Sequence, residues 1–150
     1  MPTLDDLLNT PGTPLERVSN VNKKTVQDWL VEAGRKHQDG SRMANSASTR
    51  MDAAYDAVFF CALCALAATN IRVSSKPGHH EIALQAAALT IGISTSLQDE
   101  AEVLKSWRNR KYQGAFTAKE RDVQDALATA TKYMEATSAW LQKHKAELLK

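Results

Sequence analysis

The chain has 150 residues, of which 43% are hydrophobic and 24% are charged. This length is enough for one compact domain with a hydrophobic core and too short for two comfortable ones. The formal net charge is only +2. Such a balance excludes a polycation that binds nucleic acid by its overall charge, so any basic surface must be local.

The first ten residues, MPTLDDLLNT, carry two aspartates and no basic residue. This start is unlike a secretory signal, which opens with a basic region. The longest apolar run, residues 57–68, is shorter than a bilayer requires. We therefore expect a cytoplasmic protein that makes no membrane contact.

Residues 1–22 are expected to form an N-terminal arm. Thr3 is suited to cap a short helix over the sequence LDDLL, and the following TPGTP cannot continue that helix. The apolar residues expected to pack the arm onto the domain are Leu4, Leu7, Leu8 and Val18.

The first two helices of the main domain are predicted from apolar spacing. One begins near Thr25, shows the i, i+3, i+4, i+7 pattern and ends within residues 34–40. The next runs from Ser41 to Thr69 and is apolar nearly all round after Ala57. That composition is typical of a central, buried helix.

Three further helices complete the predicted domain. One spans His79 to Ile91, and another begins after residues 94–96, with acidic residues in its first turns and basic residues in its last. The final helix opens with Thr117-Ala-Lys-Glu120, a capping-box pattern, and continues to the C-terminus. The fold class is therefore all-α, an up-and-down helical bundle of four to five helices over residues 23–150.

Cys61 and Cys64 form a CxxC pair inside the apolar run. Redox pairs usually lie at an exposed helix start, and zinc needs further ligands, which only histidines could supply here. The position in an apolar helix predicts two buried core residues instead, with no metal and no cofactor.

The segment KSWRNRKYQGAFTAKER, residues 105–121, holds six basic residues and one acidic residue. Trp107, Tyr112 and Phe116 are interleaved with the charges. Basic groups that bind phosphates and rings that stack on bases are typical of single-stranded nucleic-acid binding. A solvated helix end with its aromatic rings turned into the core has the same pattern.

Three stretches follow one another along the chain: RMDAAYDAVFFCALCAL, IRVSSKPGHHEIALQ and WRNRKYQG. In this order and spacing they resemble the HEPN superfamily, and within it the SAV_6107-like HEPN domain, over about residues 20–145. The resemblance implies a four- or five-helix bundle, commonly a homodimer. It also places the chain in a superfamily that contains many RNA-cleaving toxins.

Catalytic members of that superfamily have an Arg, four to six residues and then a His at the end of a late helix. Arg108 and Asn109 match the start of this motif. Gln113 stands at the first position where the histidine is required, and no histidine appears until His144. The resemblance therefore implies weak or no ribonuclease activity, because histidine is the group suited to accept the proton of a 2′-hydroxyl.

Histidine and tyrosine side chains elsewhere in the sequence are candidates to replace the missing base. His79 and His80 begin a helix just after a Pro-Gly loop, although adjacent helical residues point about 100° apart, so at most one faces a given site. Their alternative role is packing at the helix start. The Tyr112 hydroxyl titrates far above neutral pH.

Asp56 enters a nearly apolar helix, where an unpaired carboxylate is costly. We expect Arg108 or Arg110 to be its partner, unless Asp56 lies at the solvent-facing edge. Arg50 and Tyr55 match the same family pattern. We expect Tyr55 to pack and Arg50 to form a pair or remain exposed.

The preferred interpretation is a protein that binds RNA or a nucleotide through the end of the fourth helix. The expected nucleic-acid-binding residues are Arg108, Arg110, Lys111, Tyr112 and Arg50. Supporting roles are expected for Asp56, Tyr55, His79 and His80, and any catalytic role for Arg108, Asn109 and Tyr112. Two alternatives remain open. One is an active, metal-independent endoribonuclease toxin of a toxin-antitoxin or defence system, with a nucleotidyltransferase-type antitoxin; the other is a protein-interaction module.

Overall fold

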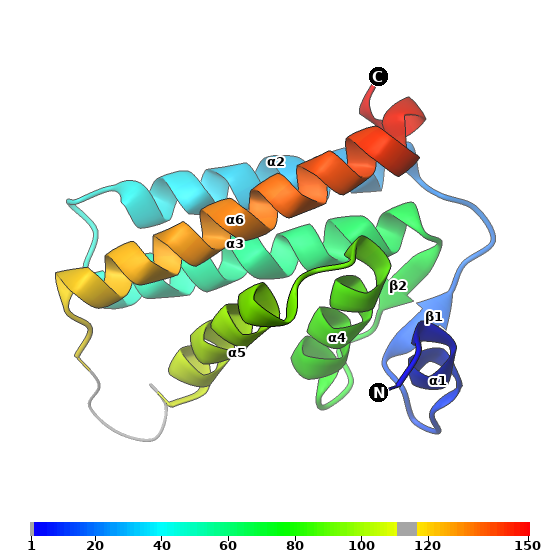
Figure 1. The fold of residues 1–150 in the computed structure, drawn as a ribbon, viewed down its shortest axis with the longest axis horizontal. Helices are drawn as coiled ribbons and strands as arrows, with labels where there is room; N and C mark the ends of the chain where they lie inside the picture. Colours follow the sequence, from blue (N-terminus) through cyan, green and yellow to red (C-terminus); the bar gives the residue numbers. More distant parts are fainter. Residues whose placement is uncertain (1, 111–116) are drawn as a thin grey trace.

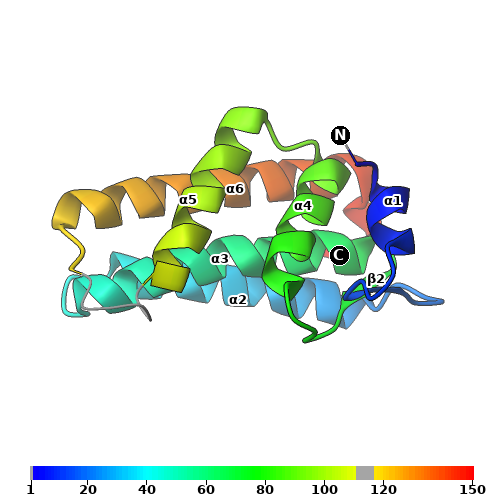
Figure 2. The ribbon, with the colours of Figure 1, turned by 90° about the horizontal axis from the view of Figure 1, so that it is seen from below.

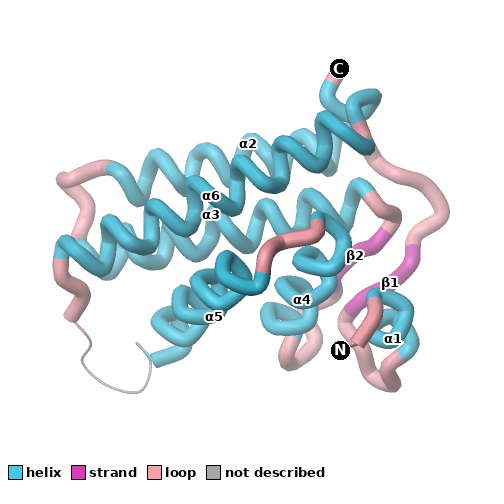
Figure 3. The backbone as a smooth tube through the Cα atoms, viewed as in Figure 1, coloured by secondary structure: helices cyan, strands magenta, loops and turns pink. Residues whose placement is uncertain are grey.

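The structure is a computed structural model that describes residues 2–110 and 117–150. Its elements are α1 (Leu4–Asn9), β1 (Leu15–Arg17), α2 (Lys23–Ser41), α3 (Ala47–Ala68), β2 (Ile71–Val73), α4 (His79–Ile91), α5 (Thr95–Arg110), α6 (Glu120–His144) and the 3₁₀ helix η1 (Ala146–Leu149). Helices dominate the fold, as Figure 3 shows. The all-α bundle with a short N-terminal segment is confirmed.

Helix α3 is the centre of the bundle. It contacts α2, α4, α5 and α6. Figures 1 and 2 show α2 and α6 lying lengthwise beside it, whereas α4 and α5 are shorter and inclined to it. Val58, Cys61 and Leu66 are completely buried, as predicted for an apolar central helix.

The length and apolar composition of α3 would also suit a membrane-spanning helix, and no other helix among the described residues meets that criterion. Of its most apolar 18-residue window, 72% is buried inside the bundle. Burial of this kind is what the core helix of a packed domain requires.

The arm begins with the predicted helix cap. Thr3 Oγ1 accepts a hydrogen bond from the Asp6 N–H at 3.1 Å, and the Asp6 carboxylate accepts one from the Thr3 N–H at 2.8 Å. Leu7 is buried in the core, but Val18 is 37% exposed. Leu4 and Leu8 are partly buried and pack against the core, so the predicted packing of the arm is carried by the leucines, and Val18 contributes only part of its surface.

A two-stranded antiparallel ribbon joins the arm to the chain between α3 and α4. Strand β1 pairs with β2, with Leu15 opposite Val73 and Arg17 opposite Ile71. The ribbon was not predicted, because strands of three residues are too short to show an alternating pattern. It places the chain segment that leads into α4 beside the arm.

The boundary between α2 and α3 differs from the predicted one. Helix α2 continues through Gly34 and Gly40 to Ser41, and α3 begins at Ala47, capped by the Ser46 hydroxyl, which accepts the Thr49 N–H. Neither glycine ends the helix, because both keep helical geometry. The predicted single helix from Ser41 to Thr69 is too long by the turn between the two helices.

The start of α6 also differs. Its N-cap is Lys119, whose N–H donates to the Asp122 carboxylate at 2.9 Å. The predicted capping box of Thr117 and Glu120 is wrong, because Glu120 is the first helical residue and its carboxylate pairs with Arg50. Helix α6 ends at His144 and is followed by η1, so it does not run to the last residue.

Candidate nucleotide-binding site

The start of α4 and the end of α5 border one cavity of about 410 Å³. Four of the residues singled out in the sequence meet there: His79 and His80 from α4, and Arg108 and Asn109 from α5. The rest of the lining is Ser75, Lys76, Pro77, Gly78, Glu81 and Lys105. Both helices pack on α3, and this shared support brings the two segments together.

Helix α4 presents its N-terminus at this cavity. It begins directly after Gly78, whose φ of 79° lies in the left-handed region that favours glycine. Gly78 has no side chain that could accept a hydrogen bond from the first turn. The unsatisfied N–H groups and the helix dipole therefore contribute partial positive charge at the cavity.

The guanidinium of Arg108 lies over the ring of Tyr55, with Cζ 5.7 Å from the ring centroid. Tyr55 is 1% exposed, so the predicted packing role is confirmed and the ring is a fixed platform. The cation–π attraction restrains Arg108 without neutralising it. The charge persists at every relevant pH because arginine does not deprotonate in proteins.

Tyr55 also determines the state of His80. Its hydroxyl lies 2.7 Å from His80 Nδ1, and burial raises the pKa of that hydroxyl despite the opposing charge of Arg108. Because Tyr55 stays protonated and is buried, its hydroxyl needs an acceptor, and Nδ1 provides one. The imidazole proton then resides on Nε2, at the other edge of the ring.

His80 is neutral at pH 7. Burial, followed by the positive charges of Arg108, His79 and Lys105, lowers the pKa of His80 from 6.5 to about 4. The Phe59 ring stacks on the imidazole at a centroid distance of 4.2 Å. In this state His80 is a hydrogen-bond donor through Nε2 and a weak base, so this side chain is better suited to hold an anion than to remove a proton.

The charges around the cavity favour an anion, with Lys76, Lys105 and Arg108 against Glu81. Lys105 is partly neutralised, since its Nζ lies 2.9 Å from the Glu102 carboxylate and 3.9 Å from that of Glu81. Arg108 and Lys76 therefore carry most of the positive charge that a ligand in the cavity would meet.

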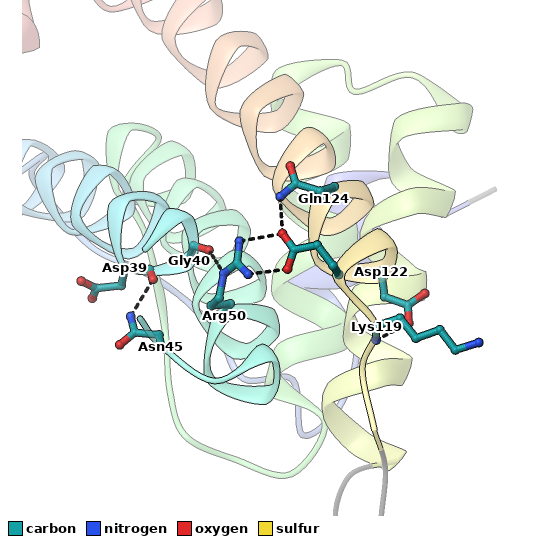
Figure 4. Close-up of polar contacts among 8 residues, drawn as sticks. Asp39, Gly40, Asn45, Arg50, Lys119, Asp122 and Gln124 are labelled. Atoms are coloured by element: carbon teal, nitrogen blue, oxygen red, sulfur yellow. Dashed lines mark hydrogen bonds and ion pairs between the residues drawn. The ribbon is translucent and has the colours of Figure 1, made fainter. Parts of the chain in front are cut away.

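Arg50 does not belong to this cavity. It is 3% exposed, its Nε donates to the Gly40 carbonyl at 2.8 Å, and its two terminal nitrogens donate to Glu120 at 2.6 and 3.3 Å. Figure 4 shows Arg50 between the end of α2 and the start of α6. The predicted pairing is confirmed, and the guanidinium is not available as the expected phosphate contact.

The remaining predicted residues divide into three groups. Asp56 is half-buried on α3, and its pairing with Arg108 or Arg110 stays a prediction. Arg110 is exposed at the last position of α5, whereas Trp107 is buried, so this ring belongs to the core and not to a stacking surface. The predicted site residues Lys111 and Tyr112 lie outside the described residues.

The cysteine pair is buried as predicted. Cys61 and Cys64 are both free thiols, and neither side chain is accessible to solvent. Burial raises the pKa of each to about 12. Within residues 2–110 and 117–150, no group of three or more histidine, cysteine or acidic side chains is arranged to hold a metal ion.

Phe59, Ser75, Lys76 and Glu81 border the histidines but were missed in the sequence. The Pro-Gly turn before His79 was the available signal for Ser75 and Lys76, since it predicts an accessible loop. Nothing local marks Phe59, which reads as one more apolar residue of α3.

No protein-family model, curated protein or solved structure matches the chain. The resemblance to the HEPN superfamily therefore stays a prediction.

Proposed function

We propose that the protein binds RNA or a nucleotide by its phosphate, in the cavity between the start of α4 and the end of α5, with weak or no ribonuclease activity. The observation that carries this proposal is the position of Arg108, which lies over the Tyr55 ring and borders the same cavity as His80. A guanidinium grips two phosphate oxygens at once. The N-terminus of α4 and His80 Nε2 add donors with the same preference for an anion.

The expected weakness of cleavage rests on His80. A general base works best when its pKa lies near the working pH, and the pKa of His80 is about 4. The histidine expected after Arg108 from the family motif is absent from the sequence. Arg108 is suited to steady a phosphate, whereas His80 is poorly tuned to take the 2′-hydroxyl proton. The other histidine of the cavity, His79, donates through Nδ1 to the Lys76 carbonyl at 3.0 Å, so its Nε2 is the remaining candidate acceptor.

The test measures retention of labelled single-stranded RNA on a filter by the wild type, Arg108→Ala and Arg108→Lys. We expect Arg108→Ala to weaken binding at least about tenfold, because a charge-assisted bidentate contact is lost. Arg108→Lys should also weaken binding, since lysine keeps the charge but not the fork geometry. Wild-type affinity should fall steeply with salt, as counterions are displaced at each phosphate contact.

Arg35→Ala is the matched control. Arg35 is exposed on α2 and pairs with Glu32, so the substitution removes the same charge away from the cavity. It should leave RNA retention nearly unchanged. If Arg108→Ala retains RNA as well as the wild type at every salt concentration, the proposal is wrong and the protein-interaction alternative takes its place.

A second candidate, a metal-independent endoribonuclease, is favoured by one observation: Arg108 and His80 border one cavity although they are 28 positions apart in the sequence. A bound phosphate would raise the pKa of His80 towards neutrality, because its negative charge stabilises the imidazolium. Product formation by the wild type and its loss in His80→Gln, with RNA retention preserved, would establish this activity. A toxin would also arrest growth when expressed without its antitoxin.

A further inference from the structure

A second cavity, of about 450 Å³, lies beside the first one and is not used by the phosphate site. Its walls are the ribbon strand β2, the first half of α2 and the second half of α3. The apolar side chains that line it include Trp29, Phe59, Leu63, Ala67 and Val73. Its volume is within the range of about 300–1,000 Å³ that is usual for small-molecule sites.

The two cavities are adjacent. Ser75 and His79 border both of them. The wall between them is aromatic: Phe59, on the apolar side, stacks on His80 at 4.2 Å between centroids and meets the edge of His79 at 6.3 Å. A ligand that passes over His79 therefore reaches an anion-binding cavity on one side and an apolar cavity on the other.

The apolar cavity suits a flat, uncharged ring with a polar edge. Trp29 lines the cavity with one face already stacked on Phe60, so its other face and its edge are the aromatic surface on offer. Phe59 is buried and stacked on His80, so it contributes an apolar wall. Asn20, Asn22 and Thr25 provide polar groups at the rim. The charged side chain in the lining is Arg72, which is already paired with Glu16. A charged group entering this cavity would lose hydration without gaining a partner, whereas a nucleobase offers both a stacking face and hydrogen-bonding atoms.

Ser74 adds a hydrogen-bonding group to this cavity. It lines the cavity, and its Oγ is buried without a hydrogen-bond partner among the described residues. Buried polar atoms normally have a partner, so this hydroxyl is a candidate to bond a ligand in the cavity. A nucleobase edge supplies both donors and acceptors for it.

We propose that the apolar cavity between α2, α3 and β2 is a nucleobase subsite, which holds the base of the nucleotide whose phosphate lies at Arg108. This inference rests on the proposed phosphate site and names its substrate class, a nucleoside monophosphate unit. Such a unit is either a free nucleotide or one residue of an RNA strand, and the base occupies the same cavity in both.

The experiment compares the binding of a nucleoside 5′-monophosphate, ribose 5-phosphate and a single-stranded RNA hexamer by calorimetry. The variants are Ala67→Leu, which fills the cavity with a good helix former, and Arg108→Ala. We expect Ala67→Leu to weaken binding of the monophosphate and of the hexamer at least about tenfold, the loss of one stacked base. Its affinity for ribose 5-phosphate should stay within about twofold of the wild type.

The outcomes separate the two proposals. If the monophosphate binds no tighter than ribose 5-phosphate and Ala67→Leu changes nothing, while Arg108→Ala still abolishes binding, the base subsite is wrong and the phosphate site stands. If none of the three ligands binds the wild type, the phosphate site itself is wrong. Trp29→Phe, which keeps an aromatic ring, should weaken monophosphate binding less than Ala67→Leu. An unchanged circular dichroism spectrum and thermal midpoint show that each variant is folded.

Discussion

The contact between Arg108 and Tyr55 couples a surface charge to a buried hydrogen bond. Arg108 lies over the ring whose hydroxyl is bonded to His80 Nδ1, so the cation and the imidazole share one support. Each positive charge near His80 makes its protonation harder. The arrangement therefore keeps two groups in different roles, a permanent cation and a neutral donor.

The first prediction follows from His80 and concerns stability against pH. Its pKa is about 4 in the folded protein and near 6.5 when unfolded, so the unfolded state binds the proton more readily. Between these two values the contribution of His80 to stability falls as pH falls, and above pH 6.5 it is fully present. Urea unfolding at several pH values should show this slope in the wild type and a smaller one in His80→Gln. Identical pH dependence in both proteins would contradict the neutral state of the half-buried His80.

The second prediction concerns the cysteines. Because the pKa of each thiol is raised to about 12 and neither is accessible, the reactive thiolate is scarce at pH 8 and out of reach. A thiol-specific reagent should label the native protein slowly and the urea-unfolded protein at once. Rapid labelling of two thiols in the native state would show that α3 is not held in the core.

Several site residues could be named from the sequence, but their juxtaposition could not. Residue type made His79, His80 and Arg108 candidates. The Pro-Gly loop before the two histidines added the expectation that they are accessible. Their meeting depends on α4 and α5 packing on the same face of the bundle, a tertiary fact that no local pattern records. Arg50 was predicted to bind nucleic acid because of its charge. Only the fold shows that its guanidinium already donates hydrogen bonds to the Gly40 carbonyl and the Glu120 carboxylate.

Helix α2 was predicted to end within residues 34–40 because of its two glycines, but it continues through both. The surroundings of the two glycines differ. A Cβ on Gly34 would meet no heavy atom within 4 Å. A Cβ on Gly40 would lie 2.8 Å from Leu127 Cδ2 and 3.2 Å from the Arg50 carbonyl oxygen. Gly34 is therefore a helical residue with open space where a side chain would lie, whereas Gly40 permits close approach of α2 to its neighbours.

The third prediction uses these glycines as a matched pair. Gly34→Ala should stabilise the protein by about 1 kcal/mol, the helix-propensity difference. Gly40→Ala should destabilise it by about 1–3 kcal/mol, because the added methyl group overpacks the junction. Urea unfolding measures both. Equal shifts of the two midpoints would mean that the junction relaxes freely around the new methyl group.

The spacing of apolar residues predicted the helices that bury an apolar face. It failed where an element depends on contacts with residues distant in the sequence. The bounds of α4 are the predicted ones, and α5 begins at Thr95, slightly before the expected start after residues 94–96. The predicted start of α6 was wrong because Thr117 and Glu120 match a capping-box pattern locally, whereas in the structure the Glu120 carboxylate pairs with Arg50. The ribbon of β1 and β2 exists only as a pairing of distant segments.

The packing of the bundle is centred on one helix, because α3 contacts α2, α4, α5 and α6. The bundle should therefore unfold as one cooperative unit with α3 at its centre. The homodimer expected from the family resemblance would add contacts on the outside of this unit. Light scattering at micromolar concentration measures the mass that decides this question.

The hub position of α3 has a consequence for the exchange of amide hydrogens with solvent deuterium. Amides in the middle of α3 can exchange only when the surrounding helices separate, so their opening free energy should equal that of global unfolding. Helix α1 has only six residues and contacts β1 and α4, so it should open alone at a lower cost. Mass-resolved exchange should show α1 labelled long before α3, with a bound nucleotide slowing exchange at the start of α4 and the end of α5.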